Sequence, residues 1–299
     1  RASWRDLVPY RQGVMILYHS VLAGHLIRLE REDAKPRIVV RDLASGEEHE
    51  ISFAEETYSL SVSPGREFDT TTIRFGYSSL ATPAETWDYD CATRARVLRK
   101  RQEVPSGHDP ARYLTRRIFA TAPDGEQVPV SLIHLAQTPL DGTAPCLLYG
   151  YGSYGTSMSA SFRTNPLSLV DRGFVYAIAH IRGGTEKGWR WYVSGKRENK
   201  PNTFKDFIAC GRALVEAGYT SPDRLVAFGG SAGGMLMGAV ANMAPDLFAG
   251  IVADVPFVDV LATMLDSDLP LTPPEWPEWG NPGTDPRAFE TILSYSPYD

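Results

Sequence analysis

Short apolar stretches separated by turn signals fill the first third of the chain. The third and fourth of these stretches are separated by a turn sequence at residues 42–46. Strands at such close spacing form an antiparallel meander, and four strands per sheet is the pattern of a β-propeller blade. The pattern therefore predicts strands at residues 14–18, 25–29, 37–41 and 50–53.

Residues 1–103 hold about two blades' worth of strands, whereas a propeller normally needs at least about four blades to close its ring. We interpret this region as the C-terminal part of a β-propeller domain, and we expect the first blades to precede Arg1. The pattern of apolar positions changes near Val104, which is where we place the start of the second domain.

Residues 104–299 show strongly apolar runs that alternate with helical stretches. This alternation is typical of βαβ units, and runs this apolar suit strands that are covered on both faces. A helix is predicted between two of the runs, with Thr203 and Asp206 as a capping box at its start and Gly218 as its stop. The predicted strands of this parallel α/β sheet are residues 130–135, 146–149, 174–179, 225–228 and 251–255.

A glycine-flanked serine, Ser231, joins one of these strands to a helical segment. With Gly229 and Gly233 it matches the nucleophile-elbow pattern G-x-S-x-G. Glycines remove the Cβ atoms that would collide at a sharp strand-to-helix turn, so the hydroxyl stands clear beside a helix N-terminus, which favours developing negative charge. The pattern predicts a catalytic nucleophile, and the alternative is a purely structural glycine-rich turn.

A serine nucleophile needs a base, usually a histidine that a carboxylate orients. Hydrolases with this elbow follow the chain order Ser, Asp, His, yet all six histidines of this chain precede Ser231. His180 ends a predicted strand and is a candidate base, although a hydrogen-bonded structural histidine is the favoured interpretation.

Residues 150–155 formally match the dinucleotide-binding pattern G-x-G-x-x-G. That fingerprint requires a helix that starts within the motif and an acid at the end of the next strand. Here residues 156–164 are polar and non-periodic, so we favour another role. A tyrosine hydroxyl of this loop, placed beside Ser231, would donate to an oxyanion; the alternative is that Tyr151 and Tyr154 are packing aromatics.

Composition narrows the classes of function. The 299 residues are 43% hydrophobic and 22% charged, as in an ordinary globular protein, and the net charge of −6 argues against a nucleic-acid partner. No apolar run approaches the roughly 18 residues of a membrane span, so we expect no membrane partner. Cys91, Cys146 and Cys210 lie far apart and suggest neither a zinc site nor a disulfide framework. We expect no metal, no cofactor and a reducing cytoplasm.

Long motifs along nearly the whole chain resemble the oligopeptidase B group of the prolyl oligopeptidase family of serine peptidases. The resemblance implies a seven-bladed propeller that caps an α/β-hydrolase domain and admits short peptides, which are cleaved after Arg or Lys. The motifs that carry it are residues 74–83, 124–131, 148–155, 177–184, 191–196, 202–207, 225–238, 255–260, 263–266, 279–282 and 294–299.

Carried over to this sequence, the resemblance implies that Ser231 is the nucleophile. The backbone N–H of Ala232 and the hydroxyl of Tyr151 then form the oxyanion hole. Glu275 takes the place of the carboxylate that receives the basic P1 side chain, and Arg182 is a second candidate substrate-binding residue. A buried carboxylate selects Arg through paired, charge-assisted hydrogen bonds; without the resemblance, Glu275 would be interpreted as a solvated loop acid.

Two departures from the family change the expectation. The family often has further acids where this chain has Pro277, Ser159 and Ser161, so a preference for a second basic residue is in doubt. The family's catalytic Asp and His lie beyond Asp299, so we expect an internal piece of a longer enzyme that is inactive on its own. The alternatives are a non-catalytic peptide-binding module or pseudoenzyme and an esterase on the same fold; the oligomeric state is left open.

Overall fold

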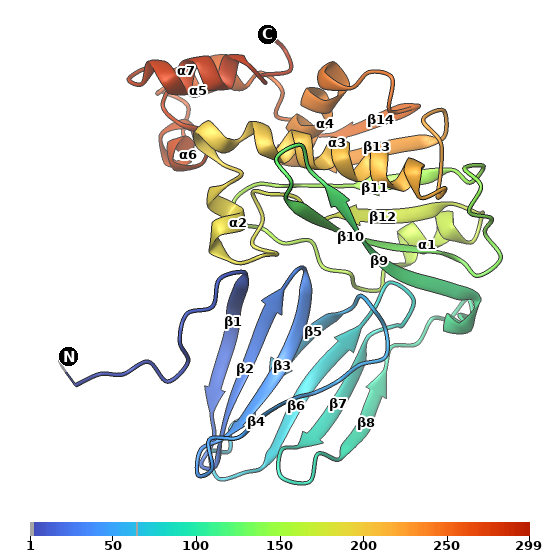
Figure 1. Cartoon of the computed structure of the whole chain (residues 1–299), viewed down its shortest axis with the longest axis vertical. Helices are drawn as coiled ribbons and strands as arrows, with labels where there is room; N and C mark the ends of the chain where they lie inside the picture. Colours follow the sequence, from blue (N-terminus) through green and yellow to red (C-terminus); the bar gives the residue numbers. More distant parts are fainter. Residues whose placement is uncertain (1–2, 64) are drawn as a thin grey trace.

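The computed structural model describes residues 3–63 and 65–299 and contains two four-stranded antiparallel sheets followed by one six-stranded mixed sheet (Figure 1). The first sheet has the strand order β1-β2-β3-β4 and the second β5-β6-β7-β8, as expected for two propeller blades. Their strands are β1 (Val14–Val21), β2 (His25–Glu32), β3 (Lys35–Asp42), β4 (Glu48–Glu50), β5 (Ser59–Ser63), β6 (Thr72–Ser78), β7 (Glu85–Asp90) and β8 (Arg96–Arg101).

The two blades pack against each other through one shared apolar core. Ile27 and Ile38 of the first blade and Ile73 and Phe75 of the second are at most 1% exposed and belong to the same cluster. Ile27 and Ile38 lie on the neighbouring strands β2 and β3, and Ile73 and Phe75 lie two residues apart on β6. Alternate residues of a strand face the same side of the sheet. Period-two patterning thus places the apolar face of both blades inward.

The predicted strand at residues 50–53 is displaced. The turn after β3 closes with the Asp42 carboxylate accepting the N–H groups of Ala44 and Ser45, so pairing resumes at Arg41 opposite Glu48. Strand β4 therefore ends at Glu50. Ile51 lies just after β4; it is 1% exposed, and its N–H still donates to Ile38 O of β3 at 3.0 Å.

The six-stranded sheet has the order β14-β13-β11-β12-β10-β9. Its strands are β9 (Tyr113–Thr121), β10 (Gln127–Leu135), β11 (Cys146–Tyr149), β12 (Val175–Ala179), β13 (Leu225–Gly230) and β14 (Gly250–Asp254). The parallel sheet predicted from the sequence is confirmed for β11–β14, whereas β10, predicted as one of its strands, runs antiparallel to both β9 and β12. The short turn around Gly125 joins β9 to β10 directly, and only antiparallel neighbours accept so short a connection.

Helices flank this sheet and extend to the C-terminal end of the chain (Figure 1). Helix α3 covers one face of the sheet with Phe204, Phe207 and Leu214, which are fully buried. The helices are η1 (Pro110–Arg112), α1 (Thr164–Val170), α2 (Trp189–Val193), η2 (Arg197–Asn199), α3 (Pro201–Glu216), α4 (Ala232–Met243), α5 (Val260–Leu265), α6 (Thr272–Trp279) and α7 (Pro286–Leu293). None of the helices that the structure describes has the length and apolarity of a membrane-spanning segment.

The predicted start of α3 was wrong and its predicted stop is confirmed. Pro201 begins the helix, and the Thr203 hydroxyl donates to the carbonyl of Arg182 at 3.0 Å instead of capping the helix. At the other end Gly218 has φ +75°, and its N–H donates to Val215 O while that of Tyr219 donates to Leu214 O. This is the Schellman arrangement that glycine favours.

The topology places two connecting segments side by side. Strand β11 lies between β12 and β13 and is parallel to both, with Tyr149 opposite Phe228 on one side and Ile178 on the other. In an open α/β sheet, ligands bind beyond the carboxyl ends of the strands where the strand order reverses. The segments that follow β11 and β13 begin at Gly150 and Ser231, so both start at this position.

We expect Gly218→Ala to destabilise the protein more than Gly173→Ala. Both glycines have positive φ, which costs an L-residue about 1–2 kcal/mol. A Cβ on Gly218 would also lie 2.6 Å from Leu140 O, whereas a Cβ on Gly173 meets nothing within 4 Å. Urea unfolding of the two variants measures the difference, and equal losses would show that the Leu140 contact relaxes without cost.

Candidate active site

Ser231 occupies a strained turn between β13 and α4. Its φ of 57° and ψ of −118° lie in a region that non-glycine residues rarely adopt. Four backbone hydrogen bonds fix it there: its N–H donates to Asp254 O at 2.9 Å, and its carbonyl accepts the N–H groups of Gly234, Met235 and Phe257. The side chain is exposed. Strain held in place by such a set of bonds is typical of a functional position.

Glycines make this turn sterically possible. A Cβ on Gly229 would lie 2.4 Å from Gly233 O, and a Cβ on Gly233 would lie 2.9 Å from Gly150 O. Both distances are shorter than real Cβ contacts, and the obstructing atoms are backbone atoms that cannot move independently. The steric argument made from the sequence therefore holds for both flanking glycines.

Tyr151 lies against the first turn of α4. A Cβ on Gly233 would be 3.3 Å from Tyr151 Cδ2, which places the tyrosine ring one turn or less from Ser231. Burial raises the pKa of Tyr151, so its phenol keeps its proton near neutral pH and remains a hydrogen-bond donor. The structure thus places the ring of a neutral tyrosine and the N–H of the buried Ala232 at the helix turn that follows Ser231.

Glu275 is held in α6 by two aromatic donors. Its Oε2 accepts hydrogen bonds from the Tyr154 hydroxyl and from Trp279 Nε1, both at 2.8 Å. The Trp279 ring packs against that of Phe257 with centroids 5.7 Å apart, and Phe257 N–H donates to the carbonyl of Ser231. A short series of contacts therefore connects this carboxylate with Ser231, which a solvated loop acid would not show.

Two buried ionisable residues behind the loop at residues 150–155 have roles that were not anticipated from the sequence. Glu278 is 4% exposed and accepts the backbone N–H of Tyr154 at 2.8 Å and the hydroxyl of Tyr192 at 2.6 Å. Lys200 is fully buried and donates to Gly152 O at 2.7 Å and Ser153 Oγ at 2.8 Å. Neither position carries a motif, because both roles depend on partners that are distant along the chain.

The structure does not support Arg182 as a substrate-binding residue. The residue is 3% exposed, and its guanidinium donates to Asp206 at 2.6 Å and 2.9 Å and to Asp124 at 2.5 Å. Burial lowers the pKa of Arg182, but the hydrogen bonds to the two carboxylates outweigh burial and raise it. With its donors engaged in this way, Arg182 joins α3 to the turn between β9 and β10.

His180 takes the structural role that the sequence analysis favoured. It is 1% exposed, and its Nε2 is 2.8 Å from Ser131 Oγ, which in turn is 2.6 Å from Thr57 Oγ1. This buried chain links the hydrolase sheet to the segment between the two blades. Buried and bonded to Ser131, His180 is held within the sheet rather than at the exposed Ser231.

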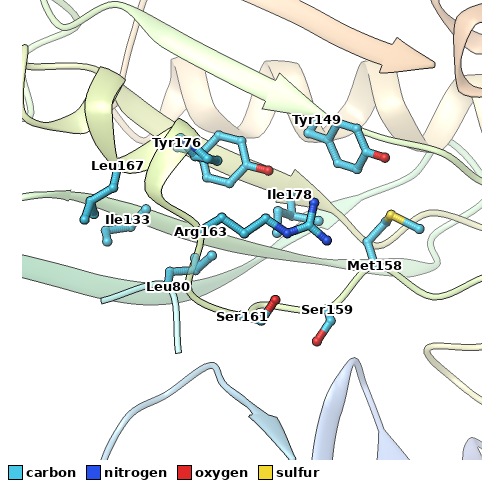
Figure 2. A pocket seen from close by; sticks show the side chains of 11 residues that line it. Leu80, Ile133, Tyr149, Met158, Ser159, Ser161, Arg163, Leu167, Tyr176 and Ile178 are labelled. Carbon is cyan, nitrogen blue, oxygen red and sulfur yellow. The ribbon is translucent and has the colours of Figure 1, made fainter. Parts of the chain in front are cut away.

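Ser159 and Ser161 line a small cavity shown in Figure 2. The cavity volume is about 20 Å³, room for about one water. The Arg163 side chain extends through it toward Tyr149 and Met158 (Figure 2). Among the described residues that line this cavity, Arg163 is the one with a charged side chain. The cavity thus holds a cation next to the two serines that stand where the family often has acids.

The loop after β11 also excludes the dinucleotide-binding alternative. Residues 150–163 contain no helix, and the next helix, α1, begins only at Thr164. The phosphate-binding arrangement needs a helix N-terminus within the motif. Across residues 3–63 and 65–299, no three or more His, Cys, Asp or Glu side chains gather in a way that could hold a metal ion.

Comparisons with known proteins agree with this architecture. Dipeptidyl aminopeptidase BI of Pseudoxanthomonas mexicana is 45% identical over 100% of this chain, and Protease 2 of Moraxella lacunata is 43% identical over 99% of it. The chain spans about 41% of the length of these curated relatives. Among solved structures, oligopeptidase B from Leishmania major superimposes with a TM-score of 0.88 and 41% identity, covering 97% of this chain and 42% of that one.

A second solved structure, oligopeptidase B from Trypanosoma brucei with covalently bound antipain, also has a TM-score of 0.88, at 42% identity; it covers 97% of this chain and 42% of that one. Residues 1–102 match the model described as the N-terminal beta-propeller domain of prolyl oligopeptidase, and residues 160–299 match the prolyl oligopeptidase family. Propeller strands therefore precede an α/β-hydrolase domain, and the chain belongs to the prolyl oligopeptidase family of serine peptidases.

Proposed function

We propose that this chain is part of an oligopeptidase that cleaves short peptides after Arg or Lys through an acyl-enzyme on Ser231. The observation that carries the proposal is the strained, exposed Ser231 with the Tyr151 ring against the same helix turn. Glu275 adds the basic specificity, because its carboxylate is oriented by two donors and connected with Ser231 through Trp279 and Phe257.

In the proposed mechanism, Ser231 Oγ attacks the peptide carbonyl carbon. The oxygen that becomes negatively charged accepts hydrogen bonds from Ala232 N–H and the Tyr151 hydroxyl. The 12-residue helix α4 begins at Ala232, so its N-terminal dipole adds to the stabilisation of this charge. A base must take the serine proton; the family resemblance assigns that role to a histidine, oriented by an aspartate, that follows Asp299 in the complete enzyme.

Glu275 is proposed to receive the basic side chain at P1. Its Oε2 is engaged by Tyr154 and Trp279, and these neutral donors leave the carboxylate charge uncompensated for an incoming cation. Charge-assisted hydrogen bonds to a guanidinium or ammonium group would then hold the P1 residue. Pro277 replaces the neighbouring acid of the family, so Glu275 carries more of the selectivity here than one member of an acidic pair would.

We further propose a cytoplasmic location. The three cysteines are all unpaired and buried, and burial raises the pKa of the thiols of Cys91, Cys146 and Cys210. Free buried thiols are typical of proteins in a reducing compartment. Assays of apolar esters against arginyl amides separate the proposed peptidase from the alternative, an esterase on the same fold.

In the complete enzyme, Ser231→Ala should abolish turnover and leave peptide binding largely intact. Loss of a serine nucleophile costs about 10⁶-fold in kcat where it has been measured, whereas peptide contacts are made by other residues. Turnover of an arginyl amide and calorimetric binding of a short arginine-containing peptide measure the two effects. An active-site serine reagent should label wild-type enzyme only at Ser231, and retained turnover in the variant would reject the nucleophile.

Glu275→Gln should lower kcat/KM for substrates with Arg or Lys at P1, by an amount that corresponds to about 2–5 kcal/mol of lost transition-state stabilisation. It should barely change kcat/KM for substrates with a neutral P1 residue. The substitution keeps the shape of the side chain but removes the charge, so only a basic P1 residue loses its partner in the transition state. Glu290→Gln, the same substitution at an exposed acid of α7, serves as the matched control. An unchanged ratio of basic to neutral cleavage in Glu275→Gln would place the specificity site elsewhere.

A further inference from the structure

We propose that Lys200 is a positioning residue that fixes the oxyanion loop, residues 150–155, relative to helix α6, which carries the proposed P1-binding carboxylate. This inference rests on the proposed function, because it assigns Lys200 a part in presenting Tyr151 to the reacting carbonyl. Lys200 contacts neither Ser231 nor the expected position of substrate, so it acts through the residues that it holds.

The Lys200 ammonium group fixes the backbone immediately after Tyr151. Its two hydrogen bonds end on the carbonyl of Gly152 and the hydroxyl of Ser153, at 2.7 Å and 2.8 Å. Gly152 has φ +76°, and a Cβ there would lie 2.4 Å from Thr203 Cγ2, so the loop has little room on that side. The position of the Tyr151 ring therefore depends on a backbone that Lys200 holds from behind.

The same ammonium group reaches α6. Its Nζ lies 5.0 Å from the ring centroid of Trp279, within the range of a cation–π contact. The indole N–H of Trp279 donates to Glu275, and Glu278 from the same helix accepts the backbone N–H of Tyr154 in the loop. Lys200 is thus the point where the oxyanion loop and the carboxylate proposed for P1 share a support.

Burying the Lys200 ammonium group costs desolvation free energy. It is 0% exposed, and across residues 3–63 and 65–299 no carboxylate forms an ion pair with it within 4.0 Å. A buried charge of this kind is often replaced by an apolar side chain of similar volume without loss of stability. A buried charge that lowers stability is expected at a position where selection for activity, rather than for stability, has retained it. Orienting a catalytic segment is such a role.

A double-mutant cycle in the complete enzyme tests the proposal. Lys200→Met, Tyr151→Phe and the double variant are compared with wild type in kcat and KM on a short arginyl amide. We expect Lys200→Met to lower kcat by about 10²-fold, the loss that a displacement of about 1 Å causes, with little change in KM. In the Tyr151→Phe background, Lys200→Met should lower kcat by less than about tenfold. The hydroxyl that Lys200 helps to position is already absent there, so its displacement has little left to affect.

Two outcomes would overturn the proposal: wild-type kcat in Lys200→Met, or losses that multiply fully in the double variant. Lys205→Met, an exposed lysine of α3, should behave as wild type. If Lys200→Met does not fold, Ser153→Ala replaces it in the cycle, since it removes one of the two acceptors and keeps the lysine. If wild-type enzyme neither cleaves the amide nor reacts at Ser231 with a serine reagent, the proposed function fails instead.

A stability measurement gives an independent readout of the buried lysine. Burial lowers the pKa of Lys200 to about 7, which the charge of Glu278 only partly offsets. Glu278 from α6 is the acid that faces it, and Tyr295, whose ring packs against Phe204, is a further titratable group on that side.

Between about pH 7 and pH 10 the unfolded chain binds more protons at this residue than the folded one. As the pH rises through this range, wild type should therefore gain stability relative to Lys200→Met. The gain should approach tenfold in the folding equilibrium constant per pH unit. The ratio of the two constants, from denaturant unfolding at several pH values, should be flat below about pH 6. A ratio independent of pH up to 10 would show that the lysine is not confined as described.

Discussion

The close approach of two backbone segments, the start of the loop at residues 150–155 and the first turn of α4, is the contact on which the proposed catalytic arrangement depends. Gly150 O would lie within 3.0 Å of a Cβ on either Gly229 or Gly233, so side chains are excluded from both sides of the contact. This approach brings Tyr151 to the turn that carries Ser231. It also fixes the N–H of Ala232, because the strained turn and the helix start are one rigid unit.

Buried charges behind this contact hold the loops rather than add much stability. Arg182 joins α3 to the β9–β10 turn through Asp206 and Asp124, while Glu278 and Lys200 bond to the backbone of the loop at residues 150–155, at Tyr154 and Gly152 respectively. The cost of removing such groups from water is of the same order as the attraction they gain. Their effect is therefore geometric, since each group accepts only one arrangement of its partners without leaving a buried charge unsatisfied.

The blades are attached to the hydrolase sheet by polar contacts of the same kind. Thr57, Ser131 and His180 form a buried hydrogen-bonded chain, and the Arg31 guanidinium donates to the hydroxyl of Thr185 at 2.7 Å. Thr185 in turn donates to Gly155 O, at the end of the oxyanion loop. The loop that presents Tyr151 thus contacts the first blade through a single intervening side chain, which ties the two parts of the chain together near the proposed site.

The amino-acid sequence alone determined the features that depend on neighbours along the chain. The apolar runs located β11 and β13, Gly218 ended α3, and the glycines around Ser231 identified the elbow, because strand burial, helix termination and turn sterics are local. Tertiary structure alone decided which partner each polar side chain finds. Thr203 and Asp206 resemble a capping box but bond to Arg182, some twenty residues away, and Lys200 and Glu278 bond to a loop that is about 50 and 124 residues distant. Such pairings arise only when the packed sheet brings these segments together, since a polar side chain removed from water must bond to whatever group the fold places beside it.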